Sequence, residues 1–179
     1  GHRCPSRQKD RFRKNLKTGE EIEENYDKLL LSPGAKPVWP NLPGMNSDKL
    51  FTLRTVEDTF RIKEFVDQQK PKSAVMVGGG FIGLEVAENL RELGLDVTIV
   101  QRPKQLMNPF DADMASFIHS EVRKHGVKLA LGYSVEGFAE KDNGVEVLLK
   151  DQPPIHPDMV VLAIGVTPES SLAKDAGLA

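Results

Sequence analysis

The sequence predicts an α/β fold built on a parallel sheet, with an antiparallel β-meander on one side of that sheet. Uncharged apolar runs at residues 73–77 and 159–164 are typical of strands buried on both faces of a parallel sheet. A glycine-rich turn, an amphipathic helix and a second strand follow the first run, so residues 73–100 form one βαβ unit. Residues 134–150 alternate around Asp142-Asn143-Gly144, which predicts a β-hairpin.

Length and composition exclude several classes of protein. The chain has 179 residues, of which 39% are hydrophobic and 28% charged, so neither a disordered segment nor a fibrous repeat is indicated. The longest uncharged apolar run is about half of what a membrane helix needs, and no secretory signal opens the chain. A net charge of −2 argues against a nucleic-acid partner. The single cysteine, Cys4, rules out an internal disulfide and fits a reducing cytoplasm.

The N-terminal part of the chain is basic and then extended. Residues 1–17 hold seven Lys or Arg and one Asp, which predicts a polyanion-binding arm or, as we favour, a solvated edge or a stretch of a longer chain. Gly1-His2 has the look of a vector remnant and is left out of fold reasoning. Residues 12–31 predict strands around a turn at residues 17–19. Four prolines within residues 33–43 predict a connector and a domain boundary.

The remaining elements follow from caps and from apolar spacing. Thr55 and Asp58 form a capping-box pattern ahead of a helix that Pro71 ends. Further strands are expected at residues 96–100 and 127–131, and a weak helix at residues 169–179. The helix after the glycine turn has an apolar stripe of Ile82, Val86, Leu90 and Leu93. The next helix, about residues 113–125, has a stripe of Met114, Phe117, Ile118 and Val122.

The glycine-rich turn points to a ligand. Gly78, Gly80 and Gly83 form G-x-G-x-x-G between a strand and a helix, the context that a dinucleotide-binding turn requires. Gly78 permits the tight turn, Gly80 lets the backbone approach a pyrophosphate, and Gly83 lets helix and strand pack closely. The N–H groups of the helix N-terminus then face the phosphates. The sequence therefore predicts an NAD(P)H site, against the alternative of a turn that serves packing alone.

The residues around this turn leave the choice of nucleotide open. An Asp or Glu at the end of the second strand would bond the ribose 2′-hydroxyl, but this chain has Gln101 there. Arg102 and Lys104 beside it could pair with a 2′-phosphate, so NADH and NADPH are both possible. Glu85, expected in the first helical turn, either complements the helix dipole or lies near the nicotinamide. Phe81 either packs in the core or covers the cofactor.

No other chemistry is indicated by the sequence. The four histidines lack the spacing of metal ligands and are expected at the surface or at helix ends. No serine or cysteine triad signature is present. We therefore predict no metal site within this chain.

Together these motifs resemble the FAD-dependent pyridine nucleotide-disulfide oxidoreductase family over roughly residues 15–179, and within it the coenzyme A-disulfide reductase, NADH oxidase and NADH peroxidase branch. Residues 26–35 are similar to the end of the family's first flavin-binding segment, and residues 161–165 to the strand that returns to the flavin domain. The resemblance implies that FAD, in the full enzyme, contacts Ser32, Pro33, Gly34 and Ala35. It implies that NAD(P)H contacts Gly78, Gly79, Gly80, Phe81, Ile82, Gly83, Glu85, Gln101, Arg102, Phe110 and Gly165.

The resemblance also implies a domain division and a function. Residues 1–35 are the basic arm and the end of the first FAD-domain segment, residues 36–158 the NAD(P)H-binding domain, and residues 159–179 the return strand. The full enzyme is expected to be a cytoplasmic homodimer that passes hydride from NAD(P)H to FAD to reduce a disulfide such as coenzyme A disulfide, a peroxide or oxygen. No membrane partner is implied.

The match to the family is partial. The family's flavin fingerprint and redox cysteine have no counterpart in this chain, and Cys4 lies in a different context. Because the redox cysteine is missing, we expect no catalytic residue in this chain. We expect it to be the middle piece of a larger enzyme, inactive when isolated. Two alternatives stay open: a stand-alone, non-catalytic dinucleotide-binding module, and a ferredoxin-reductase-like electron-transfer flavoprotein.

Overall fold

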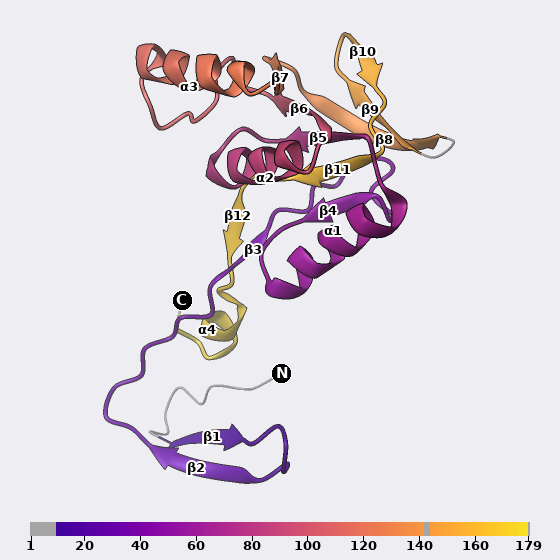
Figure 1. The fold of residues 1–179 in the computed structure, drawn as a ribbon. Helices are drawn as coiled ribbons and strands as arrows, with labels where there is room; N and C mark the ends of the chain where they lie inside the picture. Colours follow the sequence, from indigo (N-terminus) through magenta and orange to yellow (C-terminus); the bar gives the residue numbers. More distant parts are fainter. Residues whose placement is uncertain (1–9, 142–143, 179) are drawn as a thin grey trace. The chain divides into compact units, whose positions relative to one another are not determined.

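The computed structural model describes residues 10–141 and 144–178 (Figure 1). The predicted basic arm up to residue 9, with Cys4, and the Asp142-Asn143 hairpin turn lie outside the described residues. The chain forms two compact units, one of residues 37–166 and one of residues 1–36 with 167–179. In chain order the elements are β1 (Asp10–Lys14), β2 (Glu21–Asn25), β3 (Ala35–Pro37), β4 (Leu50–Thr52), α1 (Val56–Gln69), β5 (Ser73–Val77), α2 (Phe81–Glu92), β6 (Asp96–Gln101), α3 (Ala112–Lys124), β7 (Lys128–Leu131), β8 (Val135–Lys141), β9 (Gly144–Leu149), β10 (Gln152–Ile155), β11 (Met159–Leu162), β12 (Val166–Pro168) and α4 (Ser171–Asp175).

The larger unit is built on a five-stranded parallel sheet in the order β4-β11-β5-β6-β7. Every residue of β11 and all but the first residue of β5 are buried. This burial on both faces explains the continuous apolar runs that predicted these strands. At the amino ends of the two strands, the Asp158 carboxylate accepts the N–H groups of Lys72 (2.7 Å) and Ser73 (2.9 Å). The predicted α/β fold with a parallel sheet is confirmed.

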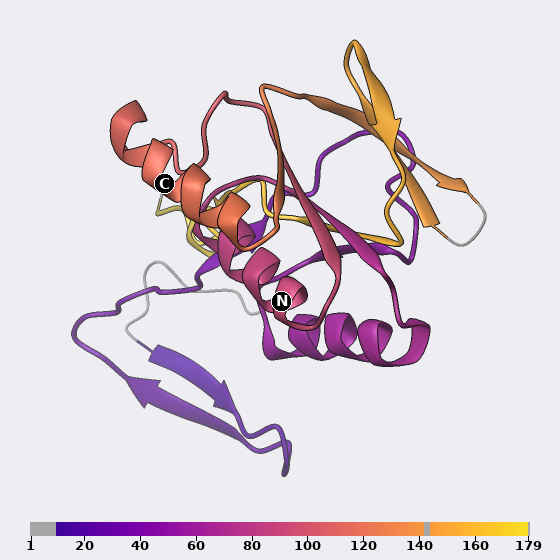
Figure 2. The ribbon, with the colours of Figure 1, turned by 45° about the horizontal axis from the view of Figure 1, so that its top comes forward.

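Two layers cover the faces of the sheet (Figure 2). On one face, Met76 and Ile99 pack in a cluster with apolar side chains of α1, α2 and α3. On the other face, Val75 and Val100 pack against side chains of β8 and β9, such as Val147. Strands β8, β9 and β10 form a three-stranded antiparallel sheet, so the predicted meander on one side is confirmed as well.

The start of α1 has the predicted capping box. The Thr55 hydroxyl accepts the N–H of Asp58 (3.2 Å), and the Asp58 carboxylate accepts the N–H of Thr55 (2.9 Å). These two bonds satisfy backbone donors that have no acceptor within the helix. The helix ends at Lys70, which has a left-handed φ of 48° and directly precedes Pro71.

Two predicted apolar stripes are only partly buried. Ile82, in the first turn of α2, and Leu93, its C-cap, are 41% and 65% exposed. Met114 and Phe117 are 52% and 70% exposed, contrary to the prediction that they face inward. The reason is that α3 packs against β7, an edge strand, which covers a narrow strip of a helix. The buried or half-buried side of α3 consists of Ala115, Ile118, His119 and Val122.

Several short strands were not predicted, and one boundary differs. Strands β3, β4 and β12 have three residues each, too few to show a period of two. The apolar residues 29–31 do not form a strand, since β2 ends at Asn25. The larger unit extends to Val166, beyond the predicted boundary after residue 158, because β11 pairs with β4 and β5 inside the sheet. The division into FAD- and NAD(P)H-binding domains stays a prediction.

The smaller unit contains a hairpin and a pair of short strands. β1 and β2 pair antiparallel around a turn in which the Gly19 N–H donates to the Asn15 carbonyl (2.7 Å). β3 pairs with β12, and the Lys36 ammonium lies 3.4 Å from the Glu169 carboxylate. A hydrogen bond from Ser171 and then the Lys36 charge hold the pKa of Glu169 below its usual value. α4 follows, where a weak helix was predicted.

Candidate functional site

The glycine-rich turn joins β5 to α2 at the carboxyl end of the parallel sheet. Gly78 has a φ of +110°, and a Cβ there would overlap the Ala163 carbonyl at the end of β11. Gly83, in the first turn of α2, has no room either, because its Cβ would overlap the Gly78 carbonyl oxygen. Any side chain at these positions would push α2 away from the sheet. The tight turn and close packing expected of these glycines are therefore present.

Gly80 stands in open space. It is the N-cap of α2 with a φ of −88°, and a Cβ there would have no neighbour within 4 Å. The first helical hydrogen bond runs from the Leu84 N–H to the Gly80 carbonyl (3.0 Å), so the N–H groups of residues 81–83 come before it. Such N–H groups, at the positive end of the helix dipole, attract anions. The turn thus offers donors and free space to a phosphate group.

The Gln101 side chain is bonded within the chain rather than presented to solvent. Its Oε1 accepts the N–H of Gly79 (2.9 Å), and its Nε2 donates to the Gln105 carbonyl at a longer 3.4 Å. On the other side of the same glycine, the Met107 N–H donates to the Gly79 carbonyl (2.8 Å). The turn is therefore bonded to the segment after β6, residues 102–111, which we call the β6–α3 loop.

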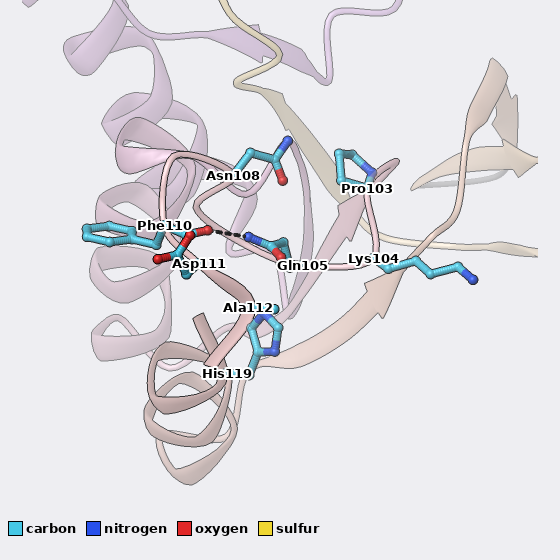
Figure 3. A pocket seen from close by; sticks show the side chains of 8 residues that line it. All are labelled: Pro103, Lys104, Gln105, Asn108, Phe110, Asp111, Ala112 and His119. Carbon is cyan, nitrogen blue, oxygen red and sulfur yellow. Dashed lines mark hydrogen bonds between the residues drawn. The ribbon is translucent and has the colours of Figure 1, made fainter. Parts of the chain in front are cut away.

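The β6–α3 loop is also anchored to α3. The N–H of the fully buried Leu106 donates to Nε2 of His119 (2.9 Å). Gln105 Nε2 donates to the Phe110 carbonyl (2.9 Å), the bond drawn in Figure 3. Partial burial, with a smaller contribution from the Arg123 charge, lowers the pKa of His119 and favours the neutral ring that can accept this bond. Loop and helix border an open pocket of about 720 Å³, lined by Pro103, Lys104, Gln105, Asn108, Phe110, Asp111, Ala112 and His119.

The other residues predicted to contact NAD(P)H are mostly exposed. Phe81 is 63% exposed at the first position of α2, so it is outside the core. Glu85 is exposed in the second turn of α2 rather than the expected first, which weakens its predicted role toward the helix dipole. Gly165 follows β11, has a φ of +118°, and accepts the Val38 N–H (3.0 Å). The remaining predicted NAD(P)H contacts, Ile82, Arg102 and Phe110, are exposed.

The predicted flavin-contacting segment belongs to the smaller unit. Residues 32–35 precede and enter β3, and Gly34 has a φ of +79°. The Gly34 carbonyl accepts the N–H of Glu169 (2.9 Å), which ties this segment to the residue after β12. The structure thus gathers the glycine turn, Gln101 and the end of β11 in the larger unit, with residues 32–35 described separately.

Sequence reasoning missed the residues that hold the β6–α3 loop. Gly79 was expected to contact the cofactor, and a Cβ there would also overlap the end of the buried Leu106 side chain, so packing against the loop favours a small residue as well. His119 was expected at the surface or at a helix end, but it is half-buried inside α3. Its spacing of four residues from Ala115 and three from Val122, both on the covered side of α3, was the available signal.

Residues 10–141 and 144–178 contain neither a membrane-spanning helix nor a metal-ligand cluster. No helix in these ranges is long and apolar enough to cross a membrane. The same ranges hold no group of three or more His, Cys, Asp or Glu side chains that could bind a metal ion.

Known proteins resemble this chain over nearly all of its length. The family model "Pyridine nucleotide-disulphide oxidoreductase" matches residues 6–179. An NADH oxidase of Methanocaldococcus jannaschii is 39% identical over 90% of this chain and 36% of its own length. A coenzyme A disulfide reductase of Staphylococcus aureus (strain JH9) is 37% identical over 92% of this chain and 36% of its own length. The chain therefore spans about a third of the curated relatives it matches.

A solved structure shares the fold. The crystal structure of reduced Bacillus anthracis CoADR-RHD superposes with a TM-score of 0.88 and is 46% identical to this chain. The similarity covers 98% of this chain and 31% of that one. Both compact units are thus included in the match.

Proposed function

The chain belongs to the pyridine nucleotide-disulphide oxidoreductase family, whose members are oxidoreductases, and from this we propose that its residues 37–166 bind NAD(P)H within an FAD-dependent enzyme. In this proposal the full enzyme passes hydride from NAD(P)H to FAD and reduces a disulfide such as coenzyme A disulfide, a peroxide or oxygen. The names of the two relatives, an NADH oxidase and a coenzyme A disulfide reductase, support these nucleotide and acceptor classes.

One observation carries the proposal: the turn is closed to side chains at Gly78 and Gly83 and open at Gly80. A turn used for packing alone would have no reason to keep its outward position free of a side chain. Here the open position lies beside the first N–H groups of α2, where a pyrophosphate binds in dinucleotide sites. The residues present therefore fit the group.

The proposal gives the other predicted residues their roles. The N–H groups that precede the first helical bond of α2 would bind the pyrophosphate, and Arg102 would lie toward the adenosine ribose. Phe81 and Glu85 on α2, with Gly165 after β11, would border the nicotinamide. In the full enzyme, Ser32, Pro33, Gly34 and Ala35 would contact FAD, as the family resemblance implies.

Gly80→Val tests the proposal. The structure has room for the side chain at a normal φ, so the variant should fold, while the isopropyl group should occupy the space of the pyrophosphate. We expect NADH affinity, measured by calorimetry on the 179-residue chain, to fall about 100-fold or more, equivalent to about 2.7 kcal/mol.

A control variant shows whether the loss of NADH affinity is specific to position 80. Ser120→Val adds a similar side chain at an exposed position of α3 and should leave NADH binding unchanged. A folded Gly80→Val variant with the affinity of the unaltered chain would contradict the proposal.

A further inference from the structure

We propose that Gln101 is a positioning residue that holds the glycine turn in its binding conformation, and that it does not read the ribose of the nucleotide. The inference rests on the proposed NAD(P)H site. It differs from the expectation drawn from sequence, in which the residue at the end of β6 contacts the 2′-hydroxyl.

First, both polar groups of the Gly79 residue are bonded to the segment from Gln101 to Met107. Its N–H donates to Gln101 Oε1 (2.9 Å) and its carbonyl accepts from the Met107 N–H (2.8 Å). Only a side chain at the end of β6 and the backbone of the β6–α3 loop take part. The direction of this peptide segment, and hence the exit of the chain into α2, is set by these two bonds.

Second, the carboxamide of Gln101 uses both of its ends. Oε1 accepts from Gly79 while Nε2 donates to the Gln105 carbonyl. A carboxylate could accept the first bond but has no proton for the second, and it would face the Gln105 oxygen instead. A side chain that makes both bonds points toward the turn, with its carboxamide oxygen and nitrogen each engaged within the chain.

Third, the loop that completes this arrangement is rigidly built. Leu106 is fully buried and packs where a Cβ of Gly79 would be. Met107 is held at a φ of 50°, a conformation that costs a non-glycine residue energy and persists where surrounding contacts impose it. The bond from Leu106 to His119 fixes the same segment to α3. Turn and loop are therefore packed as one piece, with Gln101 between them.

Fourth, the Gly79 N–H is already engaged, which leaves phosphate binding to the N–H groups of the first turn of α2. Loosening the turn would move these donors. It would therefore weaken the binding of every nucleotide that carries the pyrophosphate, whether or not its ribose has a 2′-phosphate. Discrimination between NADH and NADPH then falls to exposed side chains such as Arg102 and Lys104. If Gln101 contacted the ribose instead, its replacement would change the affinity for each nucleotide by an amount that depends on the group at the 2′ position.

The test compares three ligands on the 179-residue chain and on the variants Gln101→Met and Gln101→Ala, both uncharged. The ligands are NADH, NADPH and the NADH analogue whose adenosine lacks the 2′-hydroxyl. We expect either variant to lower the affinity for all three ligands by a similar factor of up to about tenfold, which corresponds to the loss of one hydrogen bond. The control is Gln152→Met at an exposed glutamine of β10, which should change none of them. A loss for NADH that is fivefold or more greater than for the deoxy analogue would overturn the inference.

Amide hydrogen exchange gives a second readout that needs no ligand. In the Gln101 variants the Gly79 amide should exchange faster, while amides inside β5 and β6 keep their protection. Unchanged exchange at Gly79 would overturn the inference even if binding falls. If the unaltered chain binds none of the three nucleotides, the proposed function fails, and with it the nucleotide-positioning role of Gln101. Exchange at Gly79 then still decides whether Gln101 holds the turn.

Discussion

His119 holds the β6–α3 loop through a bond that the protonated imidazolium is unable to accept. Its Nε2 accepts the Leu106 N–H (2.9 Å), and burial followed by the Arg123 charge lowers its pKa from the usual 6.5. Because the folded pKa is the lower one, the unfolded chain takes up a proton first as the pH falls. The contribution of His119 to stability is thus complete above the usual pKa and is lost as the pH falls through it toward the lower folded value.

We therefore predict that acidification destabilises the unaltered chain more than the variant His119→Gln. Glutamine supplies a carbonyl oxygen that can accept the Leu106 N–H and does not titrate. The measurement is urea denaturation of both proteins at a pH of about 7.5 and about 5.5, comparing the changes in the free energy of unfolding. Equal changes in the two proteins would contradict the role assigned to His119.

For single residues, the sequence predicted those features that depend on neighbours close in the chain. The spacing of Gly78 and Gly83 predicted a turn without side chains because its strand–turn–helix context is contiguous in sequence. The partners of Gln101 could not be predicted, because they depend on the path of an irregular loop whose key residue, Met107, adopts a left-handed conformation with no sequence signal.

At the scale of single elements, the capping box of α1 offers a direct test. Thr55→Ala removes the hydroxyl that accepts the Asp58 N–H and should lower the free energy of unfolding by about 1 kcal/mol. Thr55→Ser keeps the hydroxyl and should cost a few tenths of a kcal/mol at most. Urea denaturation of the two variants under identical conditions measures the difference. An alanine variant as stable as the serine variant would show that the cap contributes nothing.

The elements themselves were predictable where burial is two-sided or where caps are strong. β5 and β11 appear as uninterrupted apolar runs because helices pack on one face and the meander on the other. α3 was predicted, but its inward face was misjudged, since Met114 and Phe117 are apolar residues on a helix that only an edge strand supports. Such partial cover depends on sheet order, which no periodicity along one helix reveals.

At the scale of the whole molecule, the sequence predicted the order of layers but not the extent of the units. The larger unit joins residues 37–166 because β4 and β11 pair across more than 100 residues of intervening chain. The smaller unit is composed of two stretches that flank it in sequence. In the proposed function, a flavin site assembled from several such stretches would need all of them, whereas the proposed nucleotide site would need only the larger unit.

The two units differ in what they could hold of a flavin. A flavin dinucleotide needs a glycine turn and a helix N-terminus for its own pyrophosphate, and the sequence contains one G-x-G-x-x-G, already assigned to NAD(P)H. In the proposed enzyme, residues 32–35 would supply only a short segment toward the flavin. We therefore expect the 179-residue chain to bind NADH yet to retain no FAD. Without a held flavin, donor and acceptor atoms are not kept at the roughly 3–3.5 Å that hydride transfer requires, so no turnover is expected.

The measurement is an absorbance spectrum of the purified chain after incubation with FAD and desalting, followed by NADH oxidation with a disulfide acceptor. Calorimetric binding of NADH to the same sample serves as the control that the larger unit is folded. Stoichiometric flavin with turnover would contradict this prediction. NADH binding without flavin would agree with a nucleotide-binding unit that lacks the rest of a flavin site, because the proposed NADH contacts all lie in the larger unit, while hydride transfer needs both cofactors.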